Sequence, residues 1–184
     1  MNESADTIHF KAKLLRPATP KNASWSFLVL PAQASAKLRT RGMTSVDGVF
    51  EGHRFKATLD PDGRGSHWLK VTRALREQAG VGVGDTVTVA ITPASEAPEP
   101  RVPTDLREAL AAVPDARAQW ASLTSVGRRD WIQWITSAKQ AETRTRRVAK
   151  ACDMLACGKR RACCFDRSGM YSKALGAPEP AESA

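Results

Sequence analysis

The residues best suited to bind a charged partner lie in one short basic segment, residues 137–148, which reads S-A-K-Q-A-E-T-R-T-R-R-V. On a helix, steps of four, three and four residues keep side chains near one face. Guanidinium and ammonium groups displayed on such a face can bind phosphate or carboxylate oxygens, and arginine does so with a planar fork. The segment is therefore our candidate partner-binding surface, with the residues Lys139, Glu142, Thr143, Arg144, Arg146, Arg147 and, by its spacing, Lys150.

The same cations have a purely structural interpretation. In it, the arginines pair with Glu142, Asp130 and Asp153 and pack their aliphatic stems on the core. Exposed basic helix faces are often only solvated. The sequence leaves both alternatives open.

A second candidate is the loop and strand over residues 63–73, G-R-G-S-H-W-L-K-V-T-R. Its glycines allow main-chain amides to cradle an anion, and Lys70 and Arg73 follow closely. His67 has the chemistry of a general acid or base near neutral pH. No carboxylate or nucleophile can be assigned to it as a partner, so the alternative is a plain turn followed by a strand.

Other familiar chemistry is absent from the sequence. The chain has no phosphate-binding loop, dinucleotide fingerprint or zinc-protease motif. Four cysteines, at 152, 157, 163 and 164, form no C-x-x-C pair, and all histidines lie in the other half, so we expect no metal site. Cys152 fits the apolar face of a helix, whereas Cys163 and Cys164 are candidates for exposed, oxidisable thiols. We therefore assign no catalytic residue, metal or cofactor, and expect a protein that is not an enzyme.

Three tryptophans, Trp120, Trp131 and Trp134, lie close to the arginines. Aromatic rings beside cations can stack on nucleic-acid bases. Their helical spacing alongside Ile132 and Ile135 instead favours a role as core anchors.

The elements that position these residues divide the chain into a strand-rich half and a helical half. Alternating apolar residues from Ile8 to Leu14 and from Trp25 to Val29 predict strands. Further strands are expected at 46–50, 54–59, 67–71 and 86–92, with a hairpin turn at Glu51-Gly52-His53. Thr72 is expected to cap a short helix that ends at Gly80. The pattern predicts a small β-barrel over residues 1–92.

A segment rich in proline and alanine, residues 93–103, predicts a semi-rigid linker. Thr104, Pro114 and Thr124 or Ser125 are expected to start helices, and Gly158 is expected to end the last one. We predict a compact helical domain over residues 104–161, followed by a disordered tail over residues 162–184. The fold class is therefore α+β, with two domains.

The net charge of the chain is +9, from 28 basic and 19 acidic residues. Such a balance favours anionic partners, including nucleic acid and acidic proteins, and is equally typical of a basic soluble protein. No apolar run reaches the roughly 18 residues of a membrane span. The first residues lack the pattern of a signal peptide, so we expect a cytoplasmic protein.

Two segments resemble known families. W-I-x-W-I-x-S-A-K-x-x-E-T-R-x-R-R-V over residues 131–148, followed by G-K-R from Gly158, resembles the YdeI/OmpD-associated, bacteriocin-protection family over about residues 104–161. The first half resembles the small barrel of unknown function that often precedes it, through W-S-F, V-D-G, H-x-L-K-V, A-L-R and G-D-T-V-T-V. That barrel is similar to AbrB- and MazE-type double-split barrels.

The resemblance implies a bacterial protein without an established enzyme activity that protects against peptide toxins or envelope stress, acting through a partner. Our leading hypothesis is thus a non-enzymatic binding protein whose protein or anionic partner is unknown. The alternative is a nucleic-acid-binding transcriptional regulator with an AbrB-like barrel. A third hypothesis is a small-ligand binder or enzyme with an interdomain cleft lined by His67, Lys70 and Arg73.

Overall fold

The computed structural model describes residues 7–95, 99–162, 165–170 and 175–182. It divides into two compact units: residues 1–96 with 166–184, and residues 97–165. Among the described residues, none of the helices is long and apolar enough to cross a membrane.

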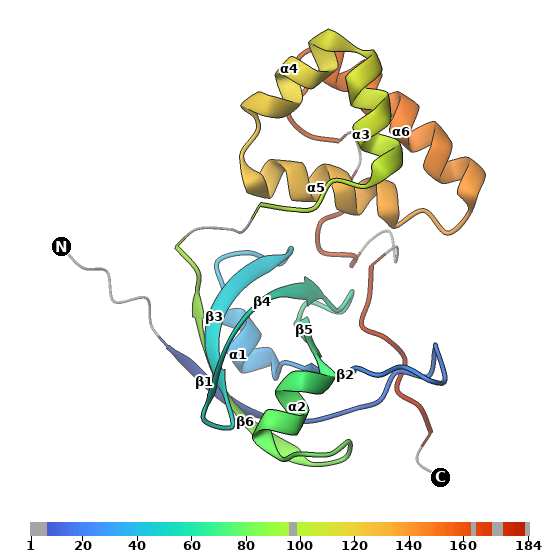
Figure 1. Cartoon of the computed structure of the whole chain (residues 1–184). Helices are drawn as coiled ribbons and strands as arrows, with labels where there is room; N and C mark the ends of the chain where they lie inside the picture. Colours follow the sequence, from blue (N-terminus) through green and yellow to red (C-terminus); the bar gives the residue numbers. More distant parts are fainter. Residues whose placement is uncertain (1–6, 96–98, 163–164, 171–174, 183–184) are drawn as a thin grey trace, which may run out of the picture. The chain divides into compact units, whose positions relative to one another are not determined.

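The first unit is built on a six-stranded antiparallel sheet that curls into a nearly closed barrel (Figure 1). Its order is β1-β6-β3-β4-β5-β2. The strands are β1 (Ile8–Lys13), β2 (Ser26–Val29), β3 (Thr44–Phe50), β4 (His53–Pro61), β5 (His67–Val71) and β6 (Thr86–Pro93). Leu15 and Phe27 exchange main-chain hydrogen bonds of 2.7 and 2.9 Å and so link the end of β1 to β2. The expected α+β class with a barrel-like sheet is confirmed.

Alternation along the strands explains why the sheet curls around one core. In β1, Ile8, Phe10 and Ala12 are buried while the residues between them are exposed. The β3–β4 turn occurs at Glu51 and Gly52, both with positive φ (45° and 84°), as a tight two-residue hairpin requires. The core includes Leu14, Leu28, Leu30, Val46, Phe50, Leu59, Leu69, Val71, Val87, Val89 and Ile91.

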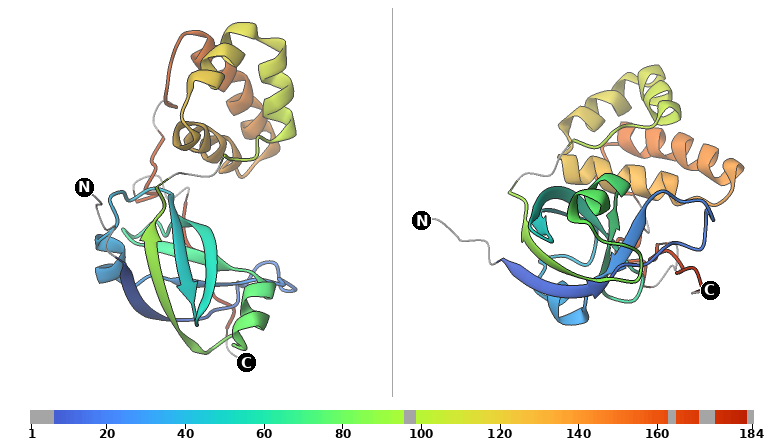
Figure 2. Two further views of the ribbon diagram at one scale, coloured as in Figure 1. Left: turned by 60° about the vertical axis from the view of Figure 1, so that its left-hand side comes forward. Right: turned by 60° about the horizontal axis from the view of Figure 1, so that its bottom comes forward.

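Among its described residues this unit also has two short helices, α1 (Ala32–Ala36) and α2 (Arg73–Ala79) (Figure 2). The predicted start and end of α2 are both confirmed. The Thr72 hydroxyl accepts a hydrogen bond from the Leu75 amide at 3.3 Å, and Gly80 adopts the left-handed conformation at φ 66°. The sequence did not predict α1.

The described residues of the second unit form four helices, shown in yellow-green to orange in Figure 1. They are α3 (Thr104–Ala112), α4 (Pro114–Ser122), α5 (Ser125–Thr136) and α6 (Ala141–Ala156). Thr124 caps α5 through the Gly127 amide at 3.1 Å, as expected. Thr104 is not a cap, because Pro103 holds that position. Gly158, at φ 79°, follows the end of α6 as predicted. The core is formed by Leu106, Leu110, Ala116, Trp120, Leu123, Trp131, Ile135, Val148, Ala151, Cys152 and Leu155.

Part of residues 162–184, for which the sequence predicts a disordered tail, pairs with the first unit. Residues 175–182 run along the first unit and bond to its main chain: the Ala18 amide donates to the Glu179 carbonyl at 2.7 Å, and the Ala181 amide donates to that of Arg16 at 2.8 Å. Local composition does not reveal pairing with residues more than 150 positions earlier in the chain.

Candidate basic interaction surface

The basic segment is not one continuous helix. Helix α5 ends at Thr136, and α6 begins at Ala141. The Thr136 hydroxyl donates to the Ile132 carbonyl at 2.9 Å, and the Ser137 hydroxyl donates to the Trp134 carbonyl at 3.0 Å. These bonds satisfy the last carbonyls of α5 and favour its end there. The predicted face is therefore corrected: Lys139 lies in the connection between helices and does not share the helical face of Arg146.

Arg144 is engaged in a contact within the helical unit. Its Nε donates to Asp105 Oδ2 at 2.7 Å and its Nη2 donates to Asp105 Oδ1 at 3.1 Å, joining α6 to α3. The hydrogen bond from Arg144 lowers the pKa of the Asp105 carboxyl, and the same bond raises the pKa of Arg144. The proposed pairing of the motif arginines with Glu142, Asp130 or Asp153 thus gives way, for Arg144, to a carboxylate on another helix.

Arg147 closes the connection between α5 and α6. Its Nη1 donates to the Trp134 carbonyl and, at 3.0 Å, to the Ser137 hydroxyl. The guanidinium carbon lies 5.4 Å from the centre of the Trp134 ring, a cation–π arrangement. A positive charge at the end of a helix also complements its dipole. This side chain therefore positions two helices.

Sequence reasoning missed Arg128, which bonds to carbonyls at the end of α4 as Arg147 does at the end of α5. Its Nε donates to the Trp120 carbonyl at 3.2 Å, and its Nη2 donates to the Ala121 carbonyl at 3.0 Å. The guanidinium also pairs with Glu99, which accepts a 2.8 Å hydrogen bond from Ser125. The bonds from Ser125 and then Arg128 lower the pKa of Glu99. The only signal in the sequence was a basic residue a few positions beyond a helix end.

The other residues of the candidate set differ from these arginines: they are Lys139, Glu142, Thr143 and Arg146, together with the neighbouring Lys150. Thr143 is half-buried, while the other four are exposed. Arg146 and Lys150, one turn apart on α6, form no hydrogen bond or ion pair with the described residues. Glu142 lies in the first turn of α6, where an acid complements the helix dipole. The structure therefore separates the motif into scaffold arginines, Arg144 and Arg147, and exposed residues, Lys139, Glu142, Arg146 and Lys150.

The second candidate set, in the barrel, does not gather at one site. His67 is fully buried. Its Nε2 donates to the Gly42 carbonyl at 2.9 Å, so its Nδ1 accepts from the Ser35 hydroxyl at 2.7 Å. Burial lowers the pKa of this imidazole. It is placed as a structural histidine, not on a surface with Lys70 and Arg73.

Lys70 and Arg73 are both exposed and have local partners. Lys70 Nζ lies 4.7 Å from the centre of the Trp25 ring. Arg73 pairs with Glu77 one turn along α2 at 2.6 Å, and this hydrogen bond raises the pKa of Arg73. Neither contact creates a binding cleft.

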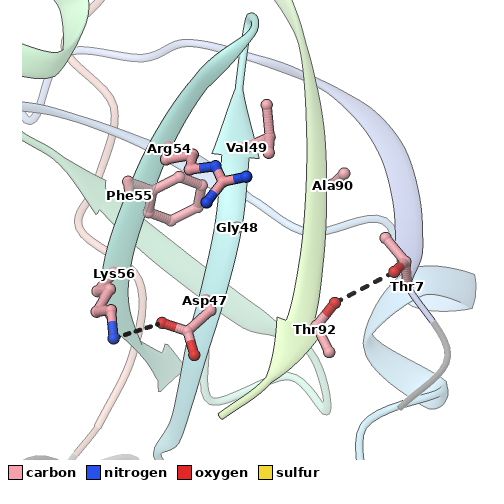
Figure 3. A pocket seen from close by; sticks show the side chains of 9 residues that line it. All are labelled: Thr7, Asp47, Gly48, Val49, Arg54, Phe55, Lys56, Ala90 and Thr92. Atoms are coloured by element: carbon pink, nitrogen blue, oxygen red, sulfur yellow. Dashed lines mark hydrogen bonds and ion pairs between the residues drawn. The ribbon is translucent and has the colours of Figure 1, made fainter. Parts of the chain in front are cut away.

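An open hollow of ≈ 700 Å³ lies on the outer face of β3, β4 and β6 (Figure 3). Lys56 and Asp47 form an ion pair of 3.4 Å on its wall, and Arg54 lies nearer to Phe55 and Val49. Phe55 also lines it and covers Gly48 on the next strand. None of His67, Lys70 and Arg73 lines this hollow, which is completed by Thr7, Val49, Ala90 and Thr92.

The three tryptophans and Cys152 lie where the sequence predicts, in or against the core of the helical unit. Trp131 is fully buried and Trp120 nearly so, and Trp134 packs against the same core, which confirms their role as core anchors. Cys152 is buried as expected, and burial raises the pKa of its thiol. Cys163 and Cys164 lie outside the described residues. Within the described part of the chain, no group of His, Cys, Asp and Glu side chains is arranged to hold a metal ion.

Comparison with protein families agrees with the resemblance read from the motifs. One family model matches residues 99–158 and another matches residues 10–91. No curated protein matches the chain. Residues 99–158 match the family described as Bacteriocin-protection, YdeI or OmpD-Associated, and residues 10–91, which precede them, match the Domain of unknown function (DUF1905).

Proposed function

We propose that the protein is a non-enzymatic binding protein that contributes to bacteriocin or antimicrobial-peptide resistance through an acidic protein partner. The family description associates the chain with bacteriocin protection. The observation that carries the proposal is that the cations of α6 fall into two groups with different environments. Arg144 and Arg147 are used to hold helices together, whereas Arg146 and Lys150 stand exposed one turn apart.

The proposed surface is rigidly mounted. Helix α6 buries Val148, Ala151, Cys152 and Leu155 against the core of the helical unit. Its other sides are tied to α3 and α5 by the two scaffold arginines. Because the helix is held in place, Arg146 and Lys150 are pre-positioned cations, and little backbone entropy is lost when a carboxylate-bearing surface binds.

The non-enzymatic character is supported by the state of His67. A general base needs to reach a substrate, yet this imidazole is fully buried and both ring nitrogens are hydrogen-bonded. Its pKa is lowered by burial, and its two bonds tie α1 and the segment before β3 to β5. This arrangement favours a structural role.

The test is complementation of a strain that lacks the gene, challenged with a bacteriocin. We expect the double variant Arg146→Gln/Lys150→Gln to lose protection while its melting temperature stays unchanged. The matched control is Arg107→Gln/Arg117→Gln, which removes the same charge from exposed positions on α3 and α4. Equal protection by the two double variants would overturn the assigned surface.

Nucleic-acid binding remains a second candidate because of one feature of the barrel. Lys11 and Lys13 are exposed on β1, and Arg54 and Lys56 are exposed on β4 of the same sheet. The expected signature is binding to duplex DNA or RNA that falls steeply between about 50 and 200 mM salt. Replacing Lys11 and Lys13 by Gln should then lower the salt slope by about 2. Absence of binding at low salt would exclude this candidate.

A further inference from the structure

Residues 175–182, called the tail below, occupy the main-chain edge of residues 16–18, which follow β1. Leu15 is bonded to Phe27, and the residues beyond it, Arg16 to Ala18, bond to the tail instead. Pro17 and Pro180 face each other as an antiparallel pair. A third bond runs from the Ala177 amide to the Asp62 carbonyl at 3.3 Å.

The register explains why prolines suit this position. The pair Pro17–Pro180 is flanked by the two hydrogen bonds, so it is a non-hydrogen-bonded pair in which neither residue needs an N–H. Pro178 is two residues away and has the same orientation. The main-chain groups of Ala177, Glu179 and Ala181 therefore point toward the barrel, and the outer side of the tail lacks proline N–H donors. An alternating-proline segment thus binds through one edge and cannot recruit a further strand.

Close packing near Leu175 also marks this as a fitted site. A Cβ atom on Gly63 would approach the Leu175 carbonyl oxygen to 2.5 Å, so only glycine allows the tail to pass here. The Glu179 side chain is exposed, and its contribution to the pairing comes from its main-chain carbonyl. The fit thus depends on backbone pattern and on proline spacing, not on the acidic side chain.

We propose that the main chain of residues 16–18, together with the Asp62 carbonyl, is a binding site for extended peptides of the pattern Ala-Pro-X-Pro-Ala. The tail of the chain is its built-in occupant. A partner protein that carries alternating prolines competes with the tail, by adding a strand to this edge. The inference concerns a different site from the α6 surface and stands independently of the proposed function.

The test uses the full chain with its tail displaced. In Ala177→Pro/Ala181→Pro both tail donors are removed, so the edge is expected to open. An eight-residue synthetic peptide, Leu-Gly-Ala-Pro-Glu-Pro-Ala-Glu, is then titrated while the Ala18 amide is followed by NMR. We expect saturable shifts in this variant and a response at least about tenfold weaker in the wild type, where the tethered tail competes at high effective concentration.

Two controls separate pattern from charge. A peptide with Pro in place of both alanines is expected not to bind, whereas one with Gln in place of the glutamate is expected to bind like the parent. A second route to an open edge is Gly63→Ala, compared with Gly80→Ala, which also has positive φ but open space around it. Equal peptide response in wild type and opened variants, or no response in either opened variant, would overturn the proposal.

Discussion

Arg144 on α6 holds both carboxylate oxygens of Asp105 on α3, with bonds of 2.7 and 3.1 Å. Asp105 lies in the first turn of α3, where negative charge is favourable, and its Oδ1 also accepts from the Leu106 amide. The aspartate is thus held ionised from two sides. An arginine of the most distinctive motif therefore joins the first helix of its unit to the last.

Replacing Arg144 by Gln should lower the free energy of unfolding by about 1 kcal/mol, because the pair is partly exposed but bidentate. Arg146→Gln removes the same charge two residues away from a position without a described partner, and should change stability by less than about 0.5 kcal/mol. Urea unfolding of both variants checks this. Equal losses would show that the Asp105 contact contributes nothing specific.

His67 should make the stability of the barrel depend on pH. Burial lowers the pKa of His67 in the folded state below its ordinary value of 6.5. As the pH falls through 6.5, the unfolded chain therefore takes up a proton first and is favoured. The contribution is fully present above this pH and is lost as the pH falls toward the folded pKa.

We expect the urea midpoint of the wild type to decrease as the pH is lowered from 7.5 to 5.5, and we expect a smaller decrease in His67→Gln. The measurement is a series of urea unfolding curves at several pH values in one buffer system. Parallel pH dependence in the two proteins would contradict the assignment of the effect to this imidazole.

Local features of the fold were predictable because their signals are short-range. The Thr72 and Thr124 caps, the Gly80 and Gly158 ends and the turn at Glu51-Gly52 depend on residues within one turn of the chain. Alternation along β1 was likewise sufficient to assign its buried face. These signals established the barrel-like sheet and the helices.

The functional separation within the motif could not be read from the sequence. The partner of Arg144 lies 39 residues away, and that of Arg147 is partly a main-chain carbonyl, which every residue carries. The break between α5 and α6 depends on hydroxyls bonding back to carbonyls, which also occurs within helices. The burial of His67 depends on the closure of the barrel. Such contacts are set by packing between distant segments.

Gly48 on β3 should resist any side chain. A Cβ atom there would lie 2.6 Å from the Ala90 carbonyl oxygen and 2.7 Å from the Phe55 ring. Because one neighbour is backbone, the clash cannot be relieved by a rotamer change, and Gly48→Ala should cost about 1–3 kcal/mol.

The matched control for Gly48 is Gly82→Ala, where the nearest atom would be Asp85 Oδ2 at an ordinary 3.7 Å and φ is not positive. It should be nearly neutral or slightly stabilising. Thermal unfolding of the two variants in parallel provides the comparison, and a neutral Gly48→Ala would show that β3 and β6 can separate without cost.

Arg147 provides the sharpest test of the scaffold assignment, because lysine preserves its charge. Lysine lacks the planar group that bonds the Trp134 carbonyl and Ser137 while lying over the Trp134 ring. Arg147→Lys should therefore lower the free energy of unfolding by about 1.5–3 kcal/mol, the range for hydrogen bonds to charged groups. Lys150→Arg, an equally conservative exchange at an exposed position, should be neutral. Urea unfolding followed by tryptophan fluorescence measures both, and a double-mutant cycle with Trp134→Leu should show coupling between Arg147 and the ring. If Arg147→Lys is as neutral as Lys150→Arg, this arginine is free to act on the binding surface and the division of the motif would have to be redrawn.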